Sequence, residues 1–465
     1  MFKNEKIINL GLGWFAENLR KQGAEVDNVK FVPRAGGDKE LIGILDKLEE
    51  KKERIEEANK KAVRMINAAQ PVLIGIARAG EVIPGMKKNL ILHAGPPVEW
   101  ERMCGPVKGA VLGALVYEGL AGDLKEAEFL AERGNIEFSP CHHHSAVGPM
   151  AGVVSYSMWV YVVENKEHGN RAFCTLNEGL GKVLRFGANS PDVLKNLKWM
   201  EEILAPAMSE ALKNAPEGID VKAITSQALL MGDECHNRNV AATDIFLKEF
   251  IPLLLSTSLS RTIITEVVNF ISSNPHTYLN LSMAACKASV DVINGLKDST
   301  VVSAMARNGT DIGIRVAATG EEWFTAPAGL PKGLYFAGFD ENDSNPDLGD
   351  STISETAGIG ANAMASAPAI VKFVGGVPDD AMRYTKKMYE ICCGESSNYR
   401  IPYFNFRGTP VGFDIMKIVE KHITPFINTG IAHKEPGIGQ IGAGLLYAPM
   451  ECFTKALLRF AEIVS

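Results

Sequence analysis

The middle of the chain carries one long stretch of helical periodicity, and this stretch most constrains the fold. Between about residues 190 and 296 nearly every segment has apolar residues three and four positions apart, as in DVLKNLKWMEEILAPAMSEALK. Strand-like runs alternate with helical patterns before it, and strand-like runs such as GIRVAATG return after Ser299. We therefore expect an α+β (mixed α/β) protein. It would comprise a Rossmann-like α/β domain over 1–188, a helical domain over 189–298, and an α+β domain with glycine-rich loops over 299–465.

The N-terminus predicts a strand, a helix and a second strand in succession. The apolar run KIINLGL begins at Lys6, and EVDNVKFVP reads as the second strand. The turn Gly11–Ala16 fits the dinucleotide pattern G-x-G-x-x-A between a strand and a helix. The acidic residue expected at the end of the second strand is missing, and Phe31–Arg34 stands there instead. A packing turn is the favoured interpretation, and a phosphate or nucleotide contact is the alternative.

Other elements follow from periodicity and from turn residues. A charged helix is expected over about 39–69, and buried strands are expected at PVLIGIA from Pro71 and NLILHAG from Asn89. A final helix is expected around 448–463.

Charge and cysteine usage argue against several classes of protein. The net charge is −7 and there is no Lys/Arg block, whereas a nucleic-acid partner would need a basic face. No run reaches about 18 apolar residues, and the first residues do not resemble a signal peptide, so we expect no membrane span. The 8 cysteines form no CxxC pair and no disulfide framework. We therefore expect a reduced, cytoplasmic protein.

Three consecutive histidines follow the short strand NIEFSP in the segment CHHHSAVGPM. On an extended strand His142 and His144 would face one side and His143 the other, and a zinc ion would need a further ligand such as His168 or Cys174. No recognised ligand spacing is present, so we expect no bound metal. The alternatives are hydrogen-bonded histidines in a loop, or imidazoles that polarise a carbonyl or hold a proton. We take His142, His143 and His144 as candidate catalytic residues.

Two other polar segments lie where strands end or helices begin. HGNRAFCTLNEGLGK follows a strand, and GDECHNRN precedes a helix with more polar groups than a helix cap needs. Their candidate substrate-binding residues are Arg171, Asn177, Glu178, Asp233, His236, Asn237 and Arg238. We expect the histidine run and these two segments to line one cleft. Glu99, after a buried strand in HAGPPVEWERMCGP, is a fourth candidate catalytic residue, with a structural loop as the alternative.

A glycine-rich segment begins at Gly349 and precedes an alanine-rich helix. The calcium-loop interpretation of the preceding FDENDSNPD fails, because the required Gly and the distal Glu are out of place. Exposed backbone amides at a helix start suit an anion, and hydroxyl groups would add donors. The candidate phosphate-binding residues are Gly349, Ser351, Thr352, Gly358 and Gly360. The charges of Asp350 and Glu355 count against this hypothesis.

The chain resembles the YlbE/AllG family through most of its length. The resemblance is carried by PPVEWERMCGP, CHHHSAVGPMAGV, HGNRAFCTLNEGLGKVLRFGA, GDECHNRN, LGDSTISETAGIGANAMA and HKEPGIGQIGAG. It implies the AllG-type subunit of an oxamate carbamoyltransferase, which works beside FdrA-type and AllH-type subunits. It also implies anaerobic allantoin (purine) catabolism, in which oxalurate and phosphate become oxamate and carbamoyl phosphate. The family's α+β arrangement with a helical domain agrees with the pattern at 190–296.

The resemblance implies no residue roles, so these follow from chemistry alone. Carbamoyl transfer passes through a tetrahedral centre that needs an anion site, donors for an oxyanion and a clamp for a carboxylate. We expect His142 or His144 to donate to the oxyanion or move a proton, and Arg171 or Arg238 to hold the carboxylate. Glu99 and Glu178 would orient the basic groups, and the loop from Gly349 would hold phosphate.

Two other functions stay open at this point. One is a subunit of an acyl-CoA or phosphate-linked ligase-like complex, suggested by the Rossmann-like start. The other is a non-catalytic assembly subunit, whose polar motifs would lie on an exposed surface. We expect no cofactor, and a homo-oligomer when the chain is isolated from its partner subunits.

Overall fold

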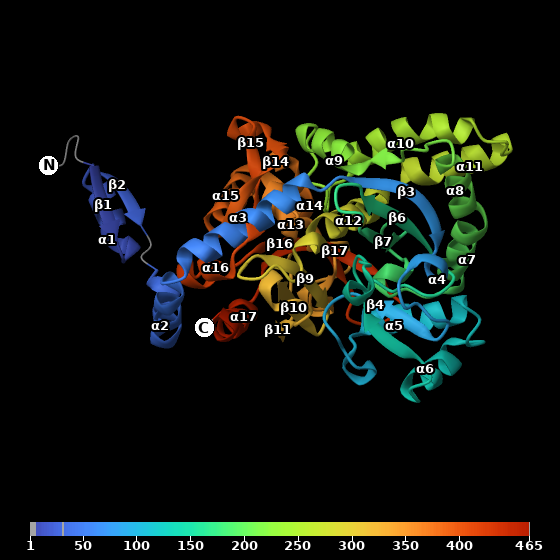
Figure 1. Ribbon diagram of the computed structural model, residues 1–465, viewed down its shortest axis with the longest axis horizontal. Coiled ribbons are helices and arrows are strands. Elements are labelled where there is room, and N and C mark those ends of the chain that lie inside the picture. The colour runs from blue at the N-terminus through green and yellow to red at the C-terminus, as the bar shows by residue number, and fades with distance from the viewer. Residues whose placement is uncertain (1–5, 30–31, 465) are drawn as a thin grey trace.

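The computed structural model describes residues 6–29 and 32–464, and Figure 1 shows the course of the chain. A small N-terminal unit stands apart from the body of the molecule in this view. It contains β1 (Lys6–Leu10), α1 (Gly13–Lys21) and β2 (Glu25–Val29), and its two strands are parallel. The predicted strand–helix–strand opening is confirmed, and Phe31 of the predicted second strand lies outside the described residues.

This N-terminal unit has little interior of its own. Its buried apolar cluster consists of Ala16, Ala24 and Val26. Large apolar side chains are more than half exposed on it, namely Ile8, Leu10, Leu12, Trp14 and Phe15. Two strands and one helix are marginal in water without more apolar burial, so we expect this unit to have little stability of its own.

Two helices lead from this unit into the body. The stretch predicted as one charged helix forms α2 (Lys39–Glu49) and α3 (Lys52–Ala68). The Asp38 side chain caps α2 by accepting hydrogen bonds from the amides of Glu40 and Leu41. α3 contacts β14 (Cys392–Ile401), so a helix from the first part of the chain lies against a strand from the last part.

The first sheet of the body is antiparallel. It has the order β7–β6–β3–β8, formed by β3 (Pro71–Arg78), β6 (Trp159–Asn165), β7 (Arg171–Thr175) and β8 (Ile219–Asp220). β4 (Leu90–His93) pairs in parallel with β5 (Glu137–Pro140), flanked by α4 (Ala79–Val82), α5 (Gly105–Tyr117) and α6 (Leu124–Glu132). The Rossmann-like pattern is therefore limited to short parallel pairs, because β3 takes antiparallel partners from later in the chain.

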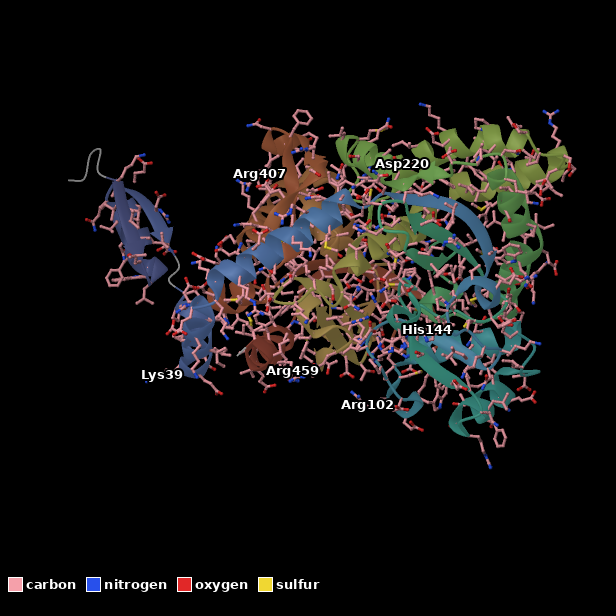
Figure 2. All side chains as sticks on the ribbon, in the orientation of Figure 1. Lys39, Arg102, His144, Asp220, Arg407 and Arg459 are labelled. Carbon is pink, nitrogen blue, oxygen red and sulfur yellow. The ribbon has the colours of Figure 1, made fainter. Side chains whose placement is uncertain are left out.

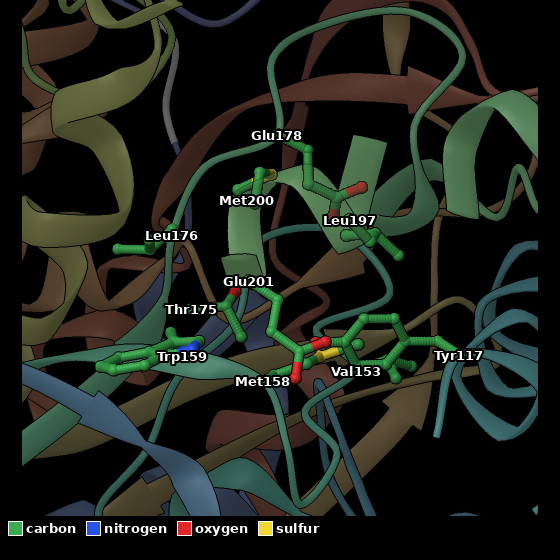
Figure 3. A pocket seen from close by; sticks show the side chains of 10 residues that line it. All are labelled: Tyr117, Val153, Met158, Trp159, Thr175, Leu176, Glu178, Leu197, Met200 and Glu201. Atoms are coloured by element: carbon green, nitrogen blue, oxygen red, sulfur yellow. The ribbon is translucent and has the colours of Figure 1, made fainter. Parts of the chain in front are cut away.

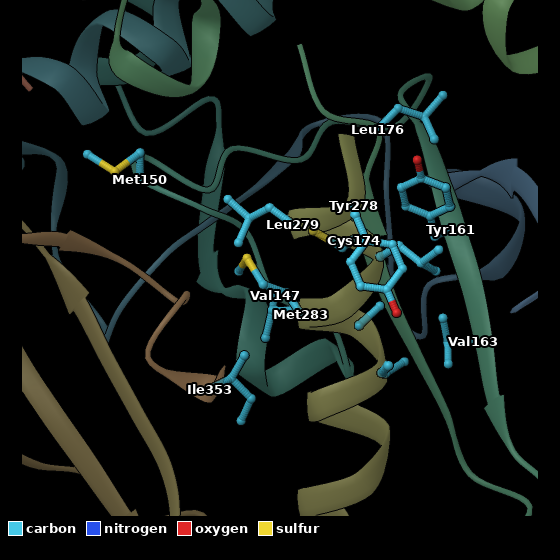
Figure 4. Close-up of a cluster of buried hydrophobic side chains, with 14 of the residues drawn as sticks. Val147, Met150, Tyr161, Val163, Cys174, Leu176, Tyr278, Leu279, Met283 and Ile353 are labelled. Atoms are coloured by element: carbon cyan, nitrogen blue, oxygen red, sulfur yellow. The ribbon is translucent and has the colours of Figure 1, made fainter. Parts of the chain in front are cut away.

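The helical periodicity of the middle of the chain is confirmed. Its elements are α7 (Pro191–Trp199), a π-helical turn (Met200–Leu204), α8 (Ala205–Leu212), α9 (Val221–Leu230), α10 (Val240–Leu255), α11 (Arg261–Ser273) and α12 (Thr277–Val290). All fourteen residues of α12 are buried, because this helix lies against β6 and β7 on one side and α13 (Ile353–Thr356) on another. Figure 4 shows Tyr278, Leu279 and Met283 of α12 among side chains of these elements.

The last third of the chain forms three antiparallel sheets. The order β11–β10–β9–β13 joins β9 (Val302–Asn308), β10 (Asp311–Val316), β11 (Phe324–Pro327) and β13 (Leu348–Gly349). The order β12–β17–β16 joins β12 (Lys332–Tyr335), β16 (Phe426–Ala432) and β17 (Gln440–Tyr447), and β14 pairs with β15 (Arg407–Phe413). The helices are α14 (Val371–Val374), α15 (Pro378–Ile391), α16 (Ile415–Lys421) and α17 (Met450–Val464).

The mixed α+β class predicted from the sequence is thus confirmed. The domain boundaries at 188/189 and 298/299 stay a prediction. One apolar cluster contains residues from Ala62 to Ala432 and so includes side chains from both sides of each boundary. A second cluster joins α2 to the sheets and helices of the last third. Within residues 6–29 and 32–464, every helix is too short or too polar to cross a membrane.

Candidate active site

A compact pocket of about 290 Å³, which we call the inner pocket, is lined by residues from three parts of the chain. These parts are the segment before residue 189, the helical middle at 189–298 and the last third from residue 299. Its polar lining residues are Arg185, His236, Asn237, His276, Ser351 and Gln440. Arg185 follows β7, while His236 and Asn237 precede α10. His276 precedes α12, Ser351 follows β13, and Gln440 begins β17. Residues from all three parts are therefore needed to build this one space.

A larger pocket of about 990 Å³, the outer pocket, shares Asn237 and His276 with the inner one. Its other lining residues are Leu180, Arg238, Asn239, Val240, Pro275, Ala369, Ile370, Lys372 and Phe373. The shared side chains form the boundary between the two pockets, so a ligand in the outer pocket can touch the wall of the inner one.

His236 is held by buried carboxylates from two directions. Its Nδ1 lies 2.8 Å from Glu355 Oε1, and the amide of Ala361 donates to the same oxygen at 2.9 Å. Glu234 accepts hydrogen bonds from the backbone amides of His236, Asn237 and Arg238 and so shapes the turn that carries them. Burial raises the pKa of Glu234 to about 7. The ring of His236 is thus fixed at Nδ1, and the inner pocket lies along its side chain.

Gly360 allows the His236–Glu355 contact. Its φ of +61° lies in the left-handed region, and a Cβ built there would lie 2.5 Å from Glu355 Oε1 and 3.3 Å from His236 Cβ. Any side chain at this position would therefore push apart the two groups that meet there.

Two polar atoms at the boundary of the pockets have no partner among the described residues. Asn237 Nδ2 and His276 Nδ1 are both buried from solvent and make no hydrogen bond. Burial, together with the nearby Arg185 charge, lowers the pKa of His276 to about 3, so its ring is neutral near pH 7. A buried polar atom without a partner is unfavourable, and a bound ligand that supplied one would be stabilised here.

Arg185 supplies a buried positive charge to the inner pocket. Its Nε and Nη2 both donate to the Gly179 carbonyl, at 3.0 and 2.7 Å, which fixes the plane of the guanidinium. The Glu178 carboxylate accepts from the backbone amides of Leu184 and Arg185, so it positions the loop rather than pairing with the side chain. Burial lowers the pKa of Arg185 to about 10, which still leaves it charged at neutral pH.

The glycine-rich segment predicted to bind phosphate is a buried turn. Arg307 donates to the Gly349 carbonyl and to the hydroxyl of Thr352, whose own hydroxyl donates to the Met305 carbonyl. The amides of Ile353, Ser354 and Gly360 donate to Asp350, Ser351 and Glu234 carbonyls. α13 is only four residues long, and of the predicted phosphate-binding residues Ser351 is the one that lines the inner pocket.

The three histidines of the CHHH run point to three different environments. His142 is buried with its Nε2 3.7 Å from Asp350 Oδ1, and His143 Nε2 accepts from Trp323 Nε1 at 2.9 Å. His144 contacts the Pro84 carbonyl and the Ser139 hydroxyl near the surface, and Figure 2 labels its position. They line neither the inner nor the outer pocket. Among the described residues, no group of three or more His, Cys, Asp or Glu side chains could hold a metal ion.

The remaining predicted site residues are spread over several places. Glu99 is exposed, and Arg171 pairs with Glu164 at the surface at 2.8 Å. Asn177 donates to Asn280 in the interior, and Asp233 accepts from the amide of Ala242 at the start of α10. Glu178 lines a separate pocket of about 390 Å³ with Tyr117, Trp159 and Glu201, shown in Figure 3.

The structure therefore brings only part of the predicted set together. His236, Asn237 and Ser351 meet in the inner pocket, with Arg238 in the outer one, and their role stays a prediction. Sequence reasoning did not single out Arg185, His276 or Gln440. Arg185 and Gln440 lie in the segments HGNRAFCTLNEGLGKVLRFGA and HKEPGIGQIGAG, so the resemblance contained a signal for both, whereas His276 is an isolated polar residue before an apolar helix.

Together the fold and the inner pocket define a mixed α+β protein with a small buried pocket lined by polar side chains from distant segments. A family model described as "Oxamate carbamoyltransferase subunit AllG" matches residues 136–351, a range that contains five of the six polar residues of the inner pocket. The chain is 45% identical over 410 residues to the Escherichia coli (strain K12) protein "Oxamate carbamoyltransferase subunit AllG", covering 88% of this chain and 98% of that protein. The chain belongs to the AllG family, as its sequence motifs predicted.

Two further comparisons cover most of the chain. It is 45% identical over 458 residues to "Uncharacterized protein YahG" of Escherichia coli (strain K12), covering 98% of this chain and 97% of that protein. It also matches the crystal structure of a conserved protein of unknown function from Enterococcus faecalis V583, with a TM-score of 0.87 and 47% identity. That match covers 89% of this chain and 99% of the solved one.

Proposed function

We propose that this protein is a subunit of an oxamate carbamoyltransferase and that its inner pocket binds the small acceptor substrate. The reaction interconverts oxamate and carbamoyl phosphate with oxalurate and phosphate, in cytoplasmic anaerobic allantoin catabolism. Partner subunits of the FdrA and AllH types would complete the enzyme. The observation that carries the proposal is the buried guanidinium of Arg185 in a pocket with unpartnered polar atoms, in a chain that matches a protein of that name over 88% of its own length.

The acceptor fits the inner pocket by charge. Oxamate is a carboxylate joined to a primary amide, and the buried Arg185 offers a positive charge of fixed orientation for the carboxylate. A guanidinium binds a carboxylate strongly in a site with little water. The amide end then lies toward His236 and Asn237.

The chemistry requires one proton transfer and one oxyanion site. The amide nitrogen of oxamate attacks the carbamoyl carbon, a C–N bond forms, and the C–O bond to phosphate breaks with its electron pair leaving on phosphate. The nitrogen loses a proton, which His236 accepts at Nε2 and passes to the departing phosphate. Glu355 at Nδ1 orients the ring so that Nε2 can take the proton. Asn237 Nδ2 donates to the carbamoyl oxygen as negative charge develops on it.

The enclosed position of these residues supports a catalytic role over a purely structural one. A subunit used only for assembly would carry its polar motifs on an exposed face, whereas Arg185, His236 and His276 are at most 7% exposed.

The test is an assay of the complex made by co-expression with FdrA-type and AllH-type subunits. We expect phosphate-dependent breakdown of oxalurate, with carbamoyl phosphate as a product. Arg185→Gln should raise the KM for oxalurate by at least about tenfold, since a hydrogen bond to a charged group contributes roughly 1.5–3 kcal/mol. The exposed Arg407→Gln serves as the matched control and should behave as the wild type. Activity that depends on coenzyme A and not on phosphate would instead support the ligase-like alternative.

A further inference from the structure

Two polar side chains of the outer pocket each have one atom that is left without a hydrogen-bond partner. Asn237 Nδ2, a donor, and Asn239 Oδ1, an acceptor, are both buried and make no hydrogen bond among the described residues. The Asn239 amide is fixed, because its Nδ2 donates to the His236 carbonyl at 2.6 Å. Both side chains line the outer pocket. One unused donor and one unused acceptor on the same turn match the C=O and NH₂ of a primary amide.

The same pocket carries positive charge without a carboxylate in its lining. Arg238 uses Nε to donate to the Gly232 carbonyl at 3.0 Å, and that nitrogen lies 3.4 Å from Asp233 Oδ1. This leaves the two terminal nitrogens of Arg238 for another partner. Lys372 is exposed on α14 and makes no ion pair with any described residue. Apolar side chains such as Phe373 and Ile370 form other parts of the lining and strengthen electrostatic attraction by excluding water.

We propose that the outer pocket is the carbamoyl phosphate subsite, in which Arg238 and Lys372 hold the phosphoryl group while Asn237 and Asn239 recognise the carbamoyl amide. This rests on the proposed function and assigns the anion to the outer pocket instead of the loop from Gly349. The carbamoyl carbon then lies at the boundary of the two pockets, next to an acceptor held by Arg185. The turn GDECHNRN would thus contribute to binding both the phosphoryl group and the carbamoyl amide. Glu234 holds the backbone of this turn in place.

The subsite can be tested on the isolated chain, without turnover. The probes are inorganic phosphate, phosphonoacetamide as a stable compound with both a phosphonate and a primary amide, and propylphosphonate, which lacks the amide. Calorimetry should show that the wild type binds phosphonoacetamide at least about tenfold more tightly than propylphosphonate. The double variant Arg238→Gln/Lys372→Gln should lose at least about tenfold in affinity for all three probes.

Asn237→Leu separates the two halves of the subsite. It should remove the preference for phosphonoacetamide and leave the affinity for inorganic phosphate unchanged. Lys455→Gln on α17 is the control for loss of a surface lysine, and circular dichroism checks that each variant is folded. Equal binding of phosphate by the wild type and the double variant, or equal binding of the amide and propyl compounds by the wild type, would overturn the proposal.

Failure of the proposed subsite and failure of the proposed transferase function give different results. Amide-selective binding that these variants abolish, in a complex that transfers no carbamoyl group, keeps the subsite and rejects the transferase. Carbamoyl transfer with an unchanged KM for phosphate in the double variant keeps the transferase and rejects the subsite.

Discussion

His236 and Glu355 stand 119 positions apart in the chain, and their side chains meet with 2.8 Å between Nδ1 and Oε1. Glu355 is completely buried and His236 nearly so. The pair joins the turn before α10 to the short helix α13, and so ties the helical middle of the chain to its last third. A buried carboxylate on one ring nitrogen selects the tautomer and the orientation of the other.

This geometry predicts the effect of Glu355→Gln. The amide keeps an oxygen for the Ala361 amide but removes the carboxylate that holds His236 Nδ1. In the reconstituted complex we expect kcat to fall roughly 10²- to 10⁴-fold, the range for loss of acid–base assistance, with a small change in KM. Steady-state kinetics across pH 6–9 is the measurement, and Glu451→Gln on the surface of α17 is the control. A wild-type kcat and pH profile in Glu355→Gln would remove Glu355 from the mechanism.

The buried ion pair of Arg307 and Asp347 predicts a large effect on stability. Arg307 is fully buried, and its Nε and Nη2 donate to the Asp347 carboxylate at 2.7 and 3.1 Å. Arg307→Met leaves that carboxylate buried without its cation and should lower the free energy of unfolding by about 3–5 kcal/mol. Arg407→Met breaks an exposed pair with Glu395 and should change it by less than about 1 kcal/mol. Urea unfolding of both variants measures the difference, and equal losses would show that burial does not set the strength of these pairs.

His276 predicts a dependence of stability on pH. Its pKa is about 3 in the folded chain, against about 6.5 for an unperturbed histidine. Between these values the unfolded chain binds a proton that the folded chain does not, so stability is lost as the pH falls through this window. From pH 7.5 to 5 the loss from this residue is roughly 2 kcal/mol, about 1.5 pH units at ~1.4 kcal/mol each. Urea unfolding at both pH values should show a loss smaller by this amount in His276→Gln, and an equal loss in both proteins would contradict the burial of this ring.

The N-terminal unit predicts tolerance to truncation. The two main apolar clusters begin at Ala35 and Ala62, and the unit's own cluster has three small residues. Removing residues 1–32 should therefore shift Tm by less than about 2 °C, because a larger shift would require the loss of roughly 1 kcal/mol or more. Leu45→Ala, in the buried face of α2, is the contrasting change and should destabilise by about 2–5 kcal/mol. Thermal unfolding followed by circular dichroism measures both, and a large drop in Tm on truncation would show that the unit contacts the body.

Local patterns predicted many elements because their causes are local. The periodicity of residues 190–296 predicted the helices, since an apolar stripe needs only the spacing of side chains along one segment. Asp38 and Ser260 cap the helices that follow them, as short polar side chains before an apolar run predict. The Rossmann-like pattern expected for residues 1–188 covers less of the chain than predicted. A strand such as β3 pairs with a segment nearly a hundred positions away, and local sequence does not show that partner.

In the candidate site, too, some residues were predictable from local sequence and others were not. The polar turn GDECHNRN marked His236, Asn237 and Arg238 as unusual from composition alone, and they line the two pockets. Arg171 looked equally suitable, yet its place on β7 directs it to Glu164 at the surface. His276 carried no local signal, because only the fold brings it into the same pocket as Arg185 and Asn237.

The sequence by itself determined the family, the α+β class and the helical middle, since motifs and periodicity are properties of contiguous residues. Only the tertiary structure decided which polar groups share a pocket. Whether a side chain is a ligand-binding group, a helix cap or one half of a surface ion pair depends on what the rest of the chain places beside it. For Arg185, Glu355 and Asn239 those neighbours come from other segments of the chain, and burial against them decides which polar atoms are left without a partner.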